Sequence, residues 1–271
     1  MPLDYRGELS GHKRAVTCSL MIATELQTIR VEDWGTIEYG KAWERQEAVL
    51  AEGLAIKQAW NAAEESGRPA APPTQHNFFL CSHPHVYTLG KSGHMENLLV
   101  NDAGLAELGV SFYKTNRGGD ITYHGPGQIV GYPMLDLEKF FTDLGKYMRS
   151  LEEVIIRTIA HYGLKGDRLP GSTGVWLDVD DPAKARKICA MGVRCSRWIT
   201  MHGFALNANT DLNYFGHIVP CGIGDKGVTS MYKELLHEVN ETALKGILLQ
   251  EFASVFEAEI SGAEGVLSEG L

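Results

Sequence analysis

The 271-residue sequence has no hydrophobic run that approaches the roughly 20 apolar residues of a transmembrane helix. It also lacks a basic excess, because 25 Lys and Arg residues stand against 34 Asp and Glu residues, for a formal net charge of −9. Proteins that bind nucleic-acid phosphates usually carry the opposite balance. We therefore expect neither a membrane protein nor a protein whose main activity is nucleic-acid binding.

Cysteine is scarce and irregularly spaced. The five cysteines are an odd number without the spacing of a disulfide framework, which favours a cytoplasmic protein. Cys81, His83 and His85 alternate, so on a strand they would share one face and could ligate zinc. Pro84 interrupts that strand and no fourth ligand has a suitable spacing, so we expect no metal.

The composition is that of an ordinary globular protein with 44% hydrophobic residues. We expect a disordered leader over residues 1–26, one catalytic domain over 27–260 and a flexible tail over 261–271. Residues 15–23 weakly imitate a secretion signal, but the stretch is short and interrupted by polar residues. A leader, an expression remnant or a start at Met21 explains it better.

Hydrophobic periodicity predicts three helices and several short strands. The expected helices cover 38–65, 138–162 and 241–260, the expected strands 27–31, 78–81 and 110–114, with further short strands within 174–208 and a loop over 66–76. Most strand connections are too short for the crossovers of a parallel sheet. The sequence therefore predicts a single α/β domain with a mixed, largely antiparallel sheet flanked by helices.

A glycine-rich stretch is the first candidate site. It consists of Arg117, Gly118, Gly119, Asp120, Ile121, Thr122, Tyr123 and His124, followed by Gly-Pro-Gly-Gln. Glycine lets a backbone approach a ligand closely, so this stretch can line a narrow site. It lacks the Lys-Ser/Thr of a phosphate-binding loop. The alternative is an ordinary tight hairpin, since the same residues favour turns.

Two further stretches contribute candidates. Lys187 precedes Ala190, Met191 and Gly192, and the apolar run beside it offers the lysine a half-buried setting. The alternative is a solvated surface lysine. The second stretch has His202 before Gly203, Phe204 and Ala205, whose small residues leave room for an extended ligand. His202 could be a catalytic base, although a structural histidine is the favoured interpretation.

Cys221 lies in an apolar Pro-Cys-Gly turn, where backbone N–H groups could hold an oxyanion. A cysteine attacks an acyl group as a thiolate, and a nearby ammonium favours that form. If Cys221 and Lys187 meet in space, the pair can run acyl transfer without a histidine. The alternative is that Cys221 is a small core residue. Cys189 and Cys195 are interpreted as structural.

Taken in order, these motifs resemble those of the lipoyl(octanoyl) transferases. The matching patterns are Arg-Gly-Gly-x-x-Thr-Tyr-His-Gly-Pro-Gly-Gln, Lys-Ile-x-x-x-Gly, His-Gly-Phe-Ala-Leu-Asn and Pro-Cys-Gly-Ile. The segment His83–Lys91 also looks like this family, and the match covers about residues 27–258. The resemblance implies a fold shared with lipoate and biotin protein ligases.

The resemblance also implies a two-step reaction and a set of partners. An octanoyl group would pass from acyl carrier protein to Cys221, and then to the target lysine of a lipoyl domain. Those domains belong to 2-oxo-acid dehydrogenases and to the glycine cleavage H protein. Lys187 would assist both steps, and residues 117–124, 190–192 and 203–205 would contact the acyl chain. No cofactor is implied, and we expect a monomer.

Three rival functions stay open on the sequence alone. An ATP-dependent lipoate or biotin ligase of the same fold would need no cysteine. A non-catalytic acyl-binding protein would form no acyl-enzyme, and an amidotransferase between two lipoyl proteins would also use a cysteine. Because the partners are expected to be acidic, the sequence predicts a basic surface at the mouth of the site, formed by Lys91, Arg117, Arg194 and Arg197.

Overall fold

The computed structural model describes residues 26–219 and 226–262. Within these ranges nine strands form one sheet in the order β12-β1-β2-β6-β10-β9-β8-β7, with β11 beside β9. These strands are β1 (Gln27–Thr36), β2 (His76–Ser82), β6 (Gln128–Met134), β7 (Asp167–Leu169), β8 (Ser172–Leu177), β9 (Arg186–Ser196), β10 (Ile199–Asn207), β11 (Gly227–Val228) and β12 (Ala258–Ser261).

The main sheet is mixed. Strand β1 pairs in parallel with both β2 and β12, and β11 pairs in parallel with β9. From β2 through β6, β10, β9 and β8 to β7 every pairing is antiparallel. The predicted α/β fold with a mixed, largely antiparallel sheet is confirmed.

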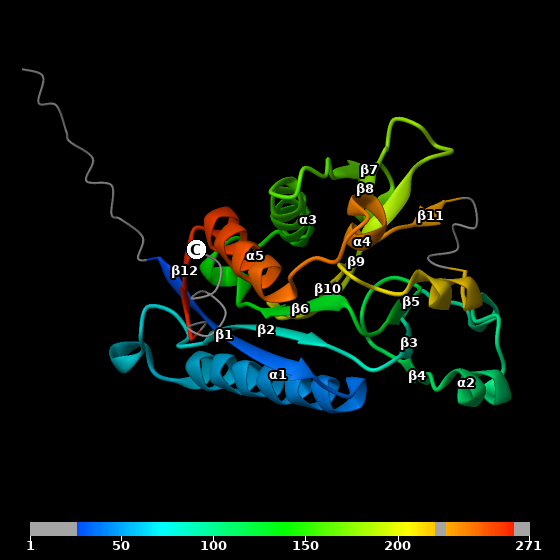
Figure 1. Cartoon of the computed structure of the whole chain (residues 1–271). Coiled ribbons are helices and arrows are strands. Elements are labelled where there is room, and N and C mark those ends of the chain that lie inside the picture. Colours follow the sequence, from blue (N-terminus) through cyan, green and yellow to red (C-terminus); the bar gives the residue numbers. More distant parts are fainter. Residues whose placement is uncertain (1–25, 220–225, 263–271) are drawn as a thin grey trace, which may run out of the picture.

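A small second sheet lies at one end of the main sheet (Figure 1). Its strands run in the order β4-β3-β5 and are β3 (Val86–Leu89), β4 (Ser111–Lys114) and β5 (Ile121–His124). Strand β5 comes directly after the glycine-rich residues 117–120, so this sheet holds that stretch at the end of the main sheet.

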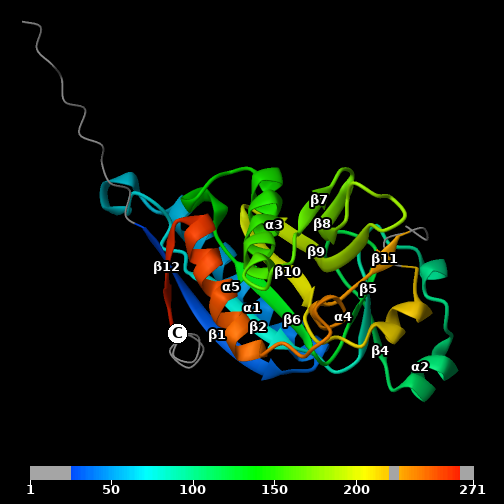
Figure 2. The ribbon, with the colours of Figure 1, turned by 45° about the horizontal axis from the view of Figure 1, so that its top comes forward.

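Helices cover both faces of the main sheet. Helix α1 (Tyr39–Ala62) lies under one face, and α3 (Leu144–Ala160) and α5 (Glu241–Phe256) lie over the other, while α2 (Asp102–Leu108) stays beside the small sheet (Figures 1 and 2). The remaining short helices are α4 (Met231–Leu235) and the 3-10 turns η1 (Glu65–Gly67), η2 (Met95–Asn97), η3 (Leu137–Lys139) and η4 (Leu212–His217).

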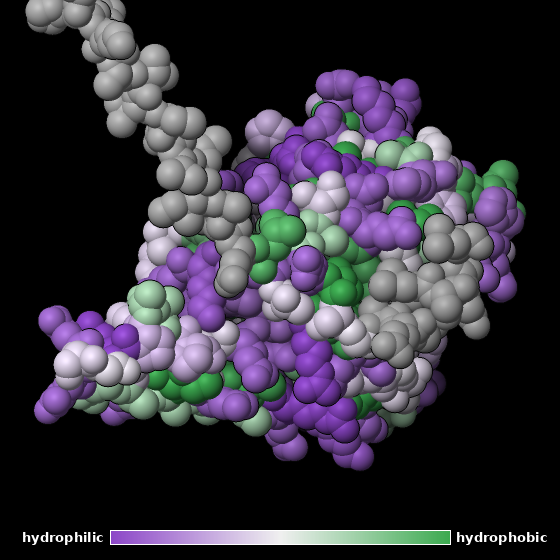
Figure 3. Space-filling model, turned by 90° about the vertical axis from the view of Figure 1, so that its left-hand side faces the viewer, coloured by the Kyte–Doolittle hydropathy of each residue, from purple (hydrophilic) through white to green (hydrophobic). Residues whose placement is uncertain are grey.

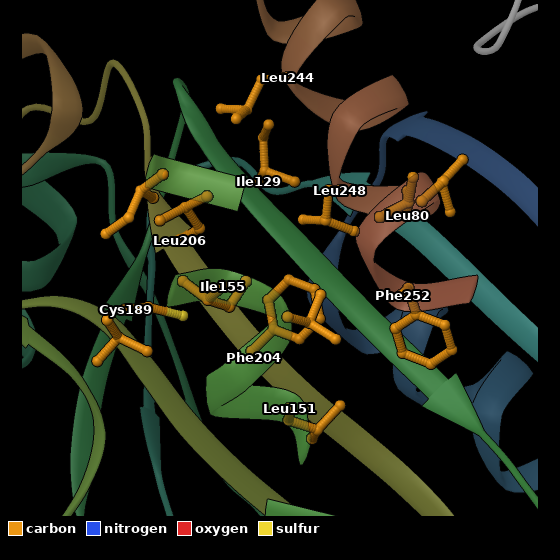
Figure 4. Packing of buried hydrophobic residues seen from close by; sticks show 14 of the residues in the cluster. Leu80, Ile129, Leu151, Ile155, Cys189, Phe204, Leu206, Leu244, Leu248 and Phe252 are labelled. Atoms are coloured by element: carbon orange, nitrogen blue, oxygen red, sulfur yellow. The ribbon is translucent and has the colours of Figure 1, made fainter. Parts of the chain in front are cut away.

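The larger core lies between the sheet and helices α3 and α5. Leu151 and Ile155 of α3 are four residues apart on one helix face, and both are fully buried. They meet side chains of β6 and β10 and, from α5, Leu248 and Phe252 (Figure 4). Burying one such side chain is worth roughly 1.5–3 kcal/mol relative to exposure. This packing fixes the sheet from which the site is built.

One face of the molecule is mainly polar (Figure 3). The face seen in Figure 3 is largely hydrophilic, with small separate apolar areas. Scattered apolar side chains are normal on a protein surface. Among the described residues we find no helix whose length and hydropathy suit a membrane span.

Two predicted helices have different ends in the structure. The helix expected from residue 138 begins only at Leu144, because Asp143 caps it by accepting a hydrogen bond from the Lys146 backbone N–H at 2.9 Å. The helix expected to reach residue 260 ends at Phe256, where Glu257 adopts a left-handed conformation with φ 49°. The chain then forms β12, so Ser261, expected to begin the tail, still belongs to the sheet.

A buried ion pair fastens α1 to the rest of the domain. The Lys57 ammonium lies 2.6 Å from Asp136 Oδ1 and also donates to the Arg197 carbonyl at 2.8 Å. The two charged side chains are only 5% and 1% exposed. Removing one member of such a pair leaves an uncompensated buried charge.

Lys57→Met should therefore lower the free energy of unfolding by about 3–5 kcal/mol, measured by urea denaturation. Lys184→Met is the matched control, because the Lys184–Asp181 pair is exposed at 70% and 44% and screened by water. It should leave the urea midpoint unchanged within error. Equal midpoints for the two variants would show that the buried pair does not fasten α1.

Candidate active site

A narrow cavity of about 50 Å³ lies where β5, β9 and β10 meet. The predicted site residues that line it are Arg117, Gly119, Asp120, Ile121, Thr122, His124, Lys187, Ala190, Met191, Gly192, Gly203, Phe204 and Ala205. Three stretches that are distant in the sequence therefore come together around one space. Contact of these residues with a bound acyl chain stays a prediction.

Glycines allow the glycine-rich stretch to lie directly against the main sheet. The Gly118 backbone N–H donates to the Val193 carbonyl at 2.9 Å, so this stretch extends the edge of β9. A Cβ on Gly192 would lie 2.7 Å from the Gly118 carbonyl oxygen, closer than real contacts allow. A side chain at position 192 would push the two walls apart. The hairpin interpretation of residues 117–128 is thus compatible with a site.

Not every predicted residue reaches the cavity. Tyr123 faces the other side of the small sheet, where its ring stacks on Tyr214 and its hydroxyl lies 2.7 Å from His85 Nδ1. Tyr123 therefore does not line the cavity, and its contact with an acyl chain stays a prediction. Gly118 instead lines a second groove next to the cavity, together with Ser92, Ser172 and Val193, which we call the outer groove. Cys221 lies outside the described residues.

The cavity has an open and a closed end. The outer groove continues from it and shares Gly119, Asp120, Lys187, Met191 and Gly192 with it. The other end is formed by side chains absent from that groove, namely Tyr39, Tyr132, His124 and His202, each at most 6% exposed. Lys187, with Met191 and Gly192, therefore lies at the mouth, and the tyrosines and histidines lie at the closed end.

Lys187 is half-buried at the mouth and does not match the alternative interpretation, a solvated surface lysine. Its Nζ lies 4.7 Å from the centroid of the Trp176 ring, a cation–π contact. Its backbone pairs with Val228 of β11, and its carbonyl accepts from the Thr229 N–H at 2.9 Å. The lysine is thus held between two strands and an indole.

A chain of buried hydrogen bonds supports the cavity wall. Arg117 donates from Nη2 to the Thr88 carbonyl at 2.6 Å and to the Thr88 hydroxyl at 2.9 Å. That hydroxyl lies 3.4 Å from His124 Nε2, and His124 Nδ1 donates to Gln128 Oε1 at 2.8 Å. The Gln128 amide in turn donates to Asn207 of β10. The small sheet is thereby tied to the main one.

Burial keeps the histidines at the closed end neutral. Burial, with Arg117 as a further cause, lowers the pKa of His202 to about 3, and burial lowers the pKa of His124 well below its usual range. Burial also lowers the pKa of His83 to about 4. A neutral imidazole with a very low pKa is a poor general base near neutral pH. The structure therefore gives no support to His202 as the catalytic base.

Sequence reasoning missed Tyr39, Tyr132 and Val130, which also line the cavity. Tyr39 starts helix α1 and is 3% exposed, so its place in the sequence, far from every motif, gave no signal. Tyr132 stands in β6, and its hydroxyl lies 2.7 Å from His83 Nε2. The packing of α1 under the sheet brings Tyr39 to the site, and the pairing of β6 with β10 brings Val130 and Tyr132.

The zinc alternative finds no support among the described residues. Strand β2 ends at Ser82, and although Cys81 Sγ lies 3.6 Å from His83 Nε2, His85 does not join them. His83 bonds the Ile37 carbonyl and Tyr132, whereas His85 turns to Tyr123. No cluster of three His, Cys, Asp or Glu side chains in that part of the chain suits a metal ion.

Three of the four residues predicted to form a basic surface at the mouth do not form one. Arg117 is 8% exposed and bonded to Thr88. Arg194 lies 2.9 Å from Glu47 of α1, which offsets its charge, and Arg197 borders a separate cavity beside Trp60. Of the four residues, only Lys91 remains exposed next to the glycine-rich stretch, where its N–H donates to the Arg117 carbonyl. Burial of Arg117, pairing of Arg194 and the distant position of Arg197 thus leave Lys91 as the basic residue of this set at the glycine-rich stretch.

The three described cysteines are poor nucleophiles. Cys81 and Cys189 are fully buried, and burial raises the pKa of each thiol well above its usual range. Cys195 is half-buried, and its pKa is also raised by burial. A thiolate needs the opposite environment. Cys189 packs in the core with β10 and α3, which agrees with its structural interpretation.

Comparison with known proteins identifies the family. The model of the lipoyl protein ligase A/B catalytic domain matches residues 52–253. Two solved lipoate ligases have similar folds: a bipartite ligase from Thermoplasma acidophilum (15% identity, 90% of this chain, 91% of that chain, TM-score 0.57) and lipoate-protein ligase A bound with ATP (12%, 90%, 93%, 0.59). The chain belongs to the lipoyl protein ligase A/B catalytic family.

Curated relatives indicate which activity within this family the chain has. An octanoyltransferase from Flavobacterium johnsoniae is 55% identical over 233 residues, which are 86% of this chain and 98% of the relative. Octanoyltransferases from Cytophaga hutchinsonii and Parabacteroides distasonis are 51% and 50% identical, covering 86% and 84% of this chain and 95% and 100% of the relatives. The chain is an acyltransferase, and the resemblance to lipoyl(octanoyl) transferases is confirmed.

The buried histidines predict acid sensitivity. His83 and His202 have folded-state pKa values of about 4 and about 3, below the roughly 6.5 of an unfolded histidine. Between these values the unfolded chain binds more protons, so the free energy of unfolding falls as the pH drops below about 6.5. Each histidine contributes a slope of about 1.4 kcal/mol per pH unit. Urea denaturation at several pH values measures it, and a flat profile would contradict the assignment.

Proposed function

We propose that this acyltransferase moves an octanoyl group from octanoyl-acyl carrier protein, through a thioester on Cys221, to the target lysine of a lipoyl domain. The observation that carries the proposal is the placement of Lys187 at the mouth of a narrow cavity walled by small and apolar residues. The choice of octanoyl as the transferred group is supported by the similarity to octanoyltransferases. Such transfer is the first step in assembling protein-bound lipoyl groups.

Cys221 is the best candidate nucleophile for two reasons. The described cysteines are buried or half-buried with raised pKa values, which leaves Cys18 and Cys221. Of these, Cys221 belongs to a segment whose two borders lie at the cavity. Val219 donates its N–H to the Asn97 carbonyl at 2.8 Å, and Val228 pairs with Lys187.

The borders lie against opposite walls. Asn97 donates from its side chain to Asp120, a cavity residue, at 2.6 Å. Val228 on the other side lies along β9, next to the mouth lysine. Residues 220–225 themselves lie outside the described ranges.

The two half-reactions balance without an external energy source. The Cys221 thiolate attacks the donor thioester, a new C–S bond forms and the C–S bond to the carrier breaks. The carrier sulfur takes a proton from the Lys187 ammonium, which leaves Lys187 as a neutral amine for the second step. The amine of the lipoyl-domain lysine then attacks the acyl-enzyme, an amide bond forms, and the Cys221 thiol is released. Thioester exchange is nearly isoenergetic and amide formation from a thioester runs downhill, so no ATP is needed.

Lys187 would serve both steps. Its ammonium stabilises the thiolate before the first attack. The incoming amine has a free pKa near 10.4 and is mostly protonated at neutral pH. A second amine at the mouth can accept its proton as the C–N bond forms. Trp176 and the pairing with β11 hold Lys187 in position for both tasks.

The acceptor class follows from the family. Lipoyl domains in general are the acceptors we propose, with those of 2-oxo-acid dehydrogenases and the glycine cleavage H protein as the expected examples. The bipartite ligase of Thermoplasma acidophilum, similar in fold, forms a lipoylation system with its E2 lipoyl domain. We propose a cytoplasmic monomer that acts without a cofactor. An ATP-dependent ligase is the second candidate, favoured only by the fold.

Cys221→Ala should abolish the covalent intermediate. Intact-mass spectrometry after incubation with octanoyl-acyl carrier protein should show one added octanoyl group on the wild-type protein and none on Cys221→Ala. Cys195→Ala is the matched control and should keep the adduct, because Cys195 does not line the cavity. An adduct that persists in Cys221→Ala, or full activity of Cys221→Ser with ATP and free lipoate, would refute the mechanism.

Lys187→Ala should slow both half-reactions by roughly 10²–10⁴-fold, the usual contribution of a positioned acid–base group. Single-turnover kinetics of acyl loading and of transfer to a lipoyl domain measure the two steps separately. Binding of the octanoyl donor should persist, because the cavity walls remain. Lys184→Ala serves as the control, since Lys184 is exposed. Rates near wild type for Lys187→Ala would remove the lysine from the mechanism.

A further inference from the structure

His202 differs from the other cavity residues with side chains in its backbone conformation, because its φ angle is positive. It has a φ of 58°, in the left-handed region, although it lies within strand β10. This conformation is unfavourable for a residue with a side chain and persists only where the surroundings impose it. Here the His202 N–H donates to Gln46 Oε1 of α1 at 2.9 Å. Strained positions of this kind concentrate at functional sites.

The imidazole of His202 is oriented by a relay from helix α1. Asn116 donates from Nδ2 to Glu47 Oε1 at 2.6 Å, which fixes the direction of its amide. Its oxygen Oδ1 therefore faces His202 Nε2, 2.7 Å away, and accepts a hydrogen bond from it. Because the ring proton sits on Nε2 in the neutral imidazole, Nδ1 carries a lone pair.

This Nδ1 is buried and has no hydrogen-bond partner among the described residues. The two other histidines nearby are different. His83 bonds with both ring nitrogens, to the Ile37 carbonyl and to Tyr132, and His124 bonds with both, to Gln128 and Thr88. A purely structural histidine would be expected to be satisfied in the same way. His202 is thus held in a costly conformation with one acceptor unpaired.

His202 lies at the opposite end of the cavity from Lys187. It pairs across the ladder with Val193, which is six residues along β9 from Lys187. At about 3.3 Å per residue, their backbones are roughly 20 Å apart. The extended Lys187 side chain covers part of this length, and an acyl chain of limited length can cover the rest. His202 is also 1% exposed, as expected for the closed end.

We propose that His202 determines which acyl chain length the enzyme accepts, by forming a rigid polar wall where the chain ends. This inference rests on the proposed octanoyl transfer. A longer chain would have to press its last methylenes against an imidazole that the Glu47–Asn116 relay holds in place. It would also enclose an unpaired acceptor without offering a donor, which is unfavourable. A chain that stops short of the ring meets neither cost.

His202→Gly tests the inference directly. Glycine adopts a positive φ without strain, so the variant removes the wall while the backbone keeps its path. We would measure kcat/KM for hexanoyl, octanoyl and decanoyl pantetheine thioesters. The ratio of decanoyl to octanoyl should rise by about tenfold to a hundredfold, the range that enclosing an unpaired buried polar group implies. His202→Asn tolerates the same φ and should give a smaller rise.

Arg197→Gly is the matched control. Arg197 also has a positive φ, 46°, but it lies in the β9–β10 turn and does not line the cavity. It tests whether relieving strain next to β10 is by itself enough to change chain-length preference. The ratio should stay at the wild-type value. A rise as large as that of His202→Gly would overturn the inference.

Binding measurements separate this inference from the proposed function. If the wild-type protein transfers no octanoyl group, the proposed function fails, and calorimetry with octanoate and decanoate still tests the wall. His202→Gly should then favour decanoate relative to octanoate more than wild type does. An unchanged ratio in both kinetics and binding, for a variant whose circular dichroism matches wild type, overturns the role of His202. If His202→Gly does not fold, the His202→Asn ratio decides in the same way.

Discussion

Buried polar groups must be paired, and this constraint shapes the whole site. The hydrogen-bond chain from Arg117 through Thr88, His124 and Gln128 to Asn207 joins the small sheet to the main one. Each member is at most 8% exposed, so breaking one link leaves its neighbours without water to replace it. The cavity lies between the two sheets and keeps its shape because this chain holds its walls together.

The site combines a glycine-rich sequence with a rigid support. Glycines have no side chains, so the backbone of residues 117–119 can lie directly against β9. Glycines also make a backbone flexible, and the hydrogen bonds from Arg117 to Thr88 restrain this stretch. Helix α1 adds a second support from the far face, through Tyr39 and through the relay to His202. A slot built this way can exclude water from an apolar chain and leave only its mouth, at Lys187, open to polar partners.

Much of the fold and most of the cavity wall were predictable, because they depend on local rules. Helical periodicity located α3 and α5, and motif order located the three stretches that meet at the cavity. The errors have physical causes. Asp143 and Glu257 ended helices that apolar spacing alone would have extended. Tyr123 sits in the best motif yet faces away, since alternation along a strand depends on a register that the sequence does not reveal.

The sequence by itself determined the class of the fold, the glycine-rich wall and the identity of the family, because hydrophobic period, turn chemistry and motif order are properties of neighbouring residues. Only the tertiary structure decided which end of the cavity is closed and that Arg117 and Arg194 are bonded within the protein. It also decided that His202 is strained, with one ring nitrogen unpaired among the described residues. Burial and partner choice arise from contacts between residues far apart in the chain, and no local pattern encodes them.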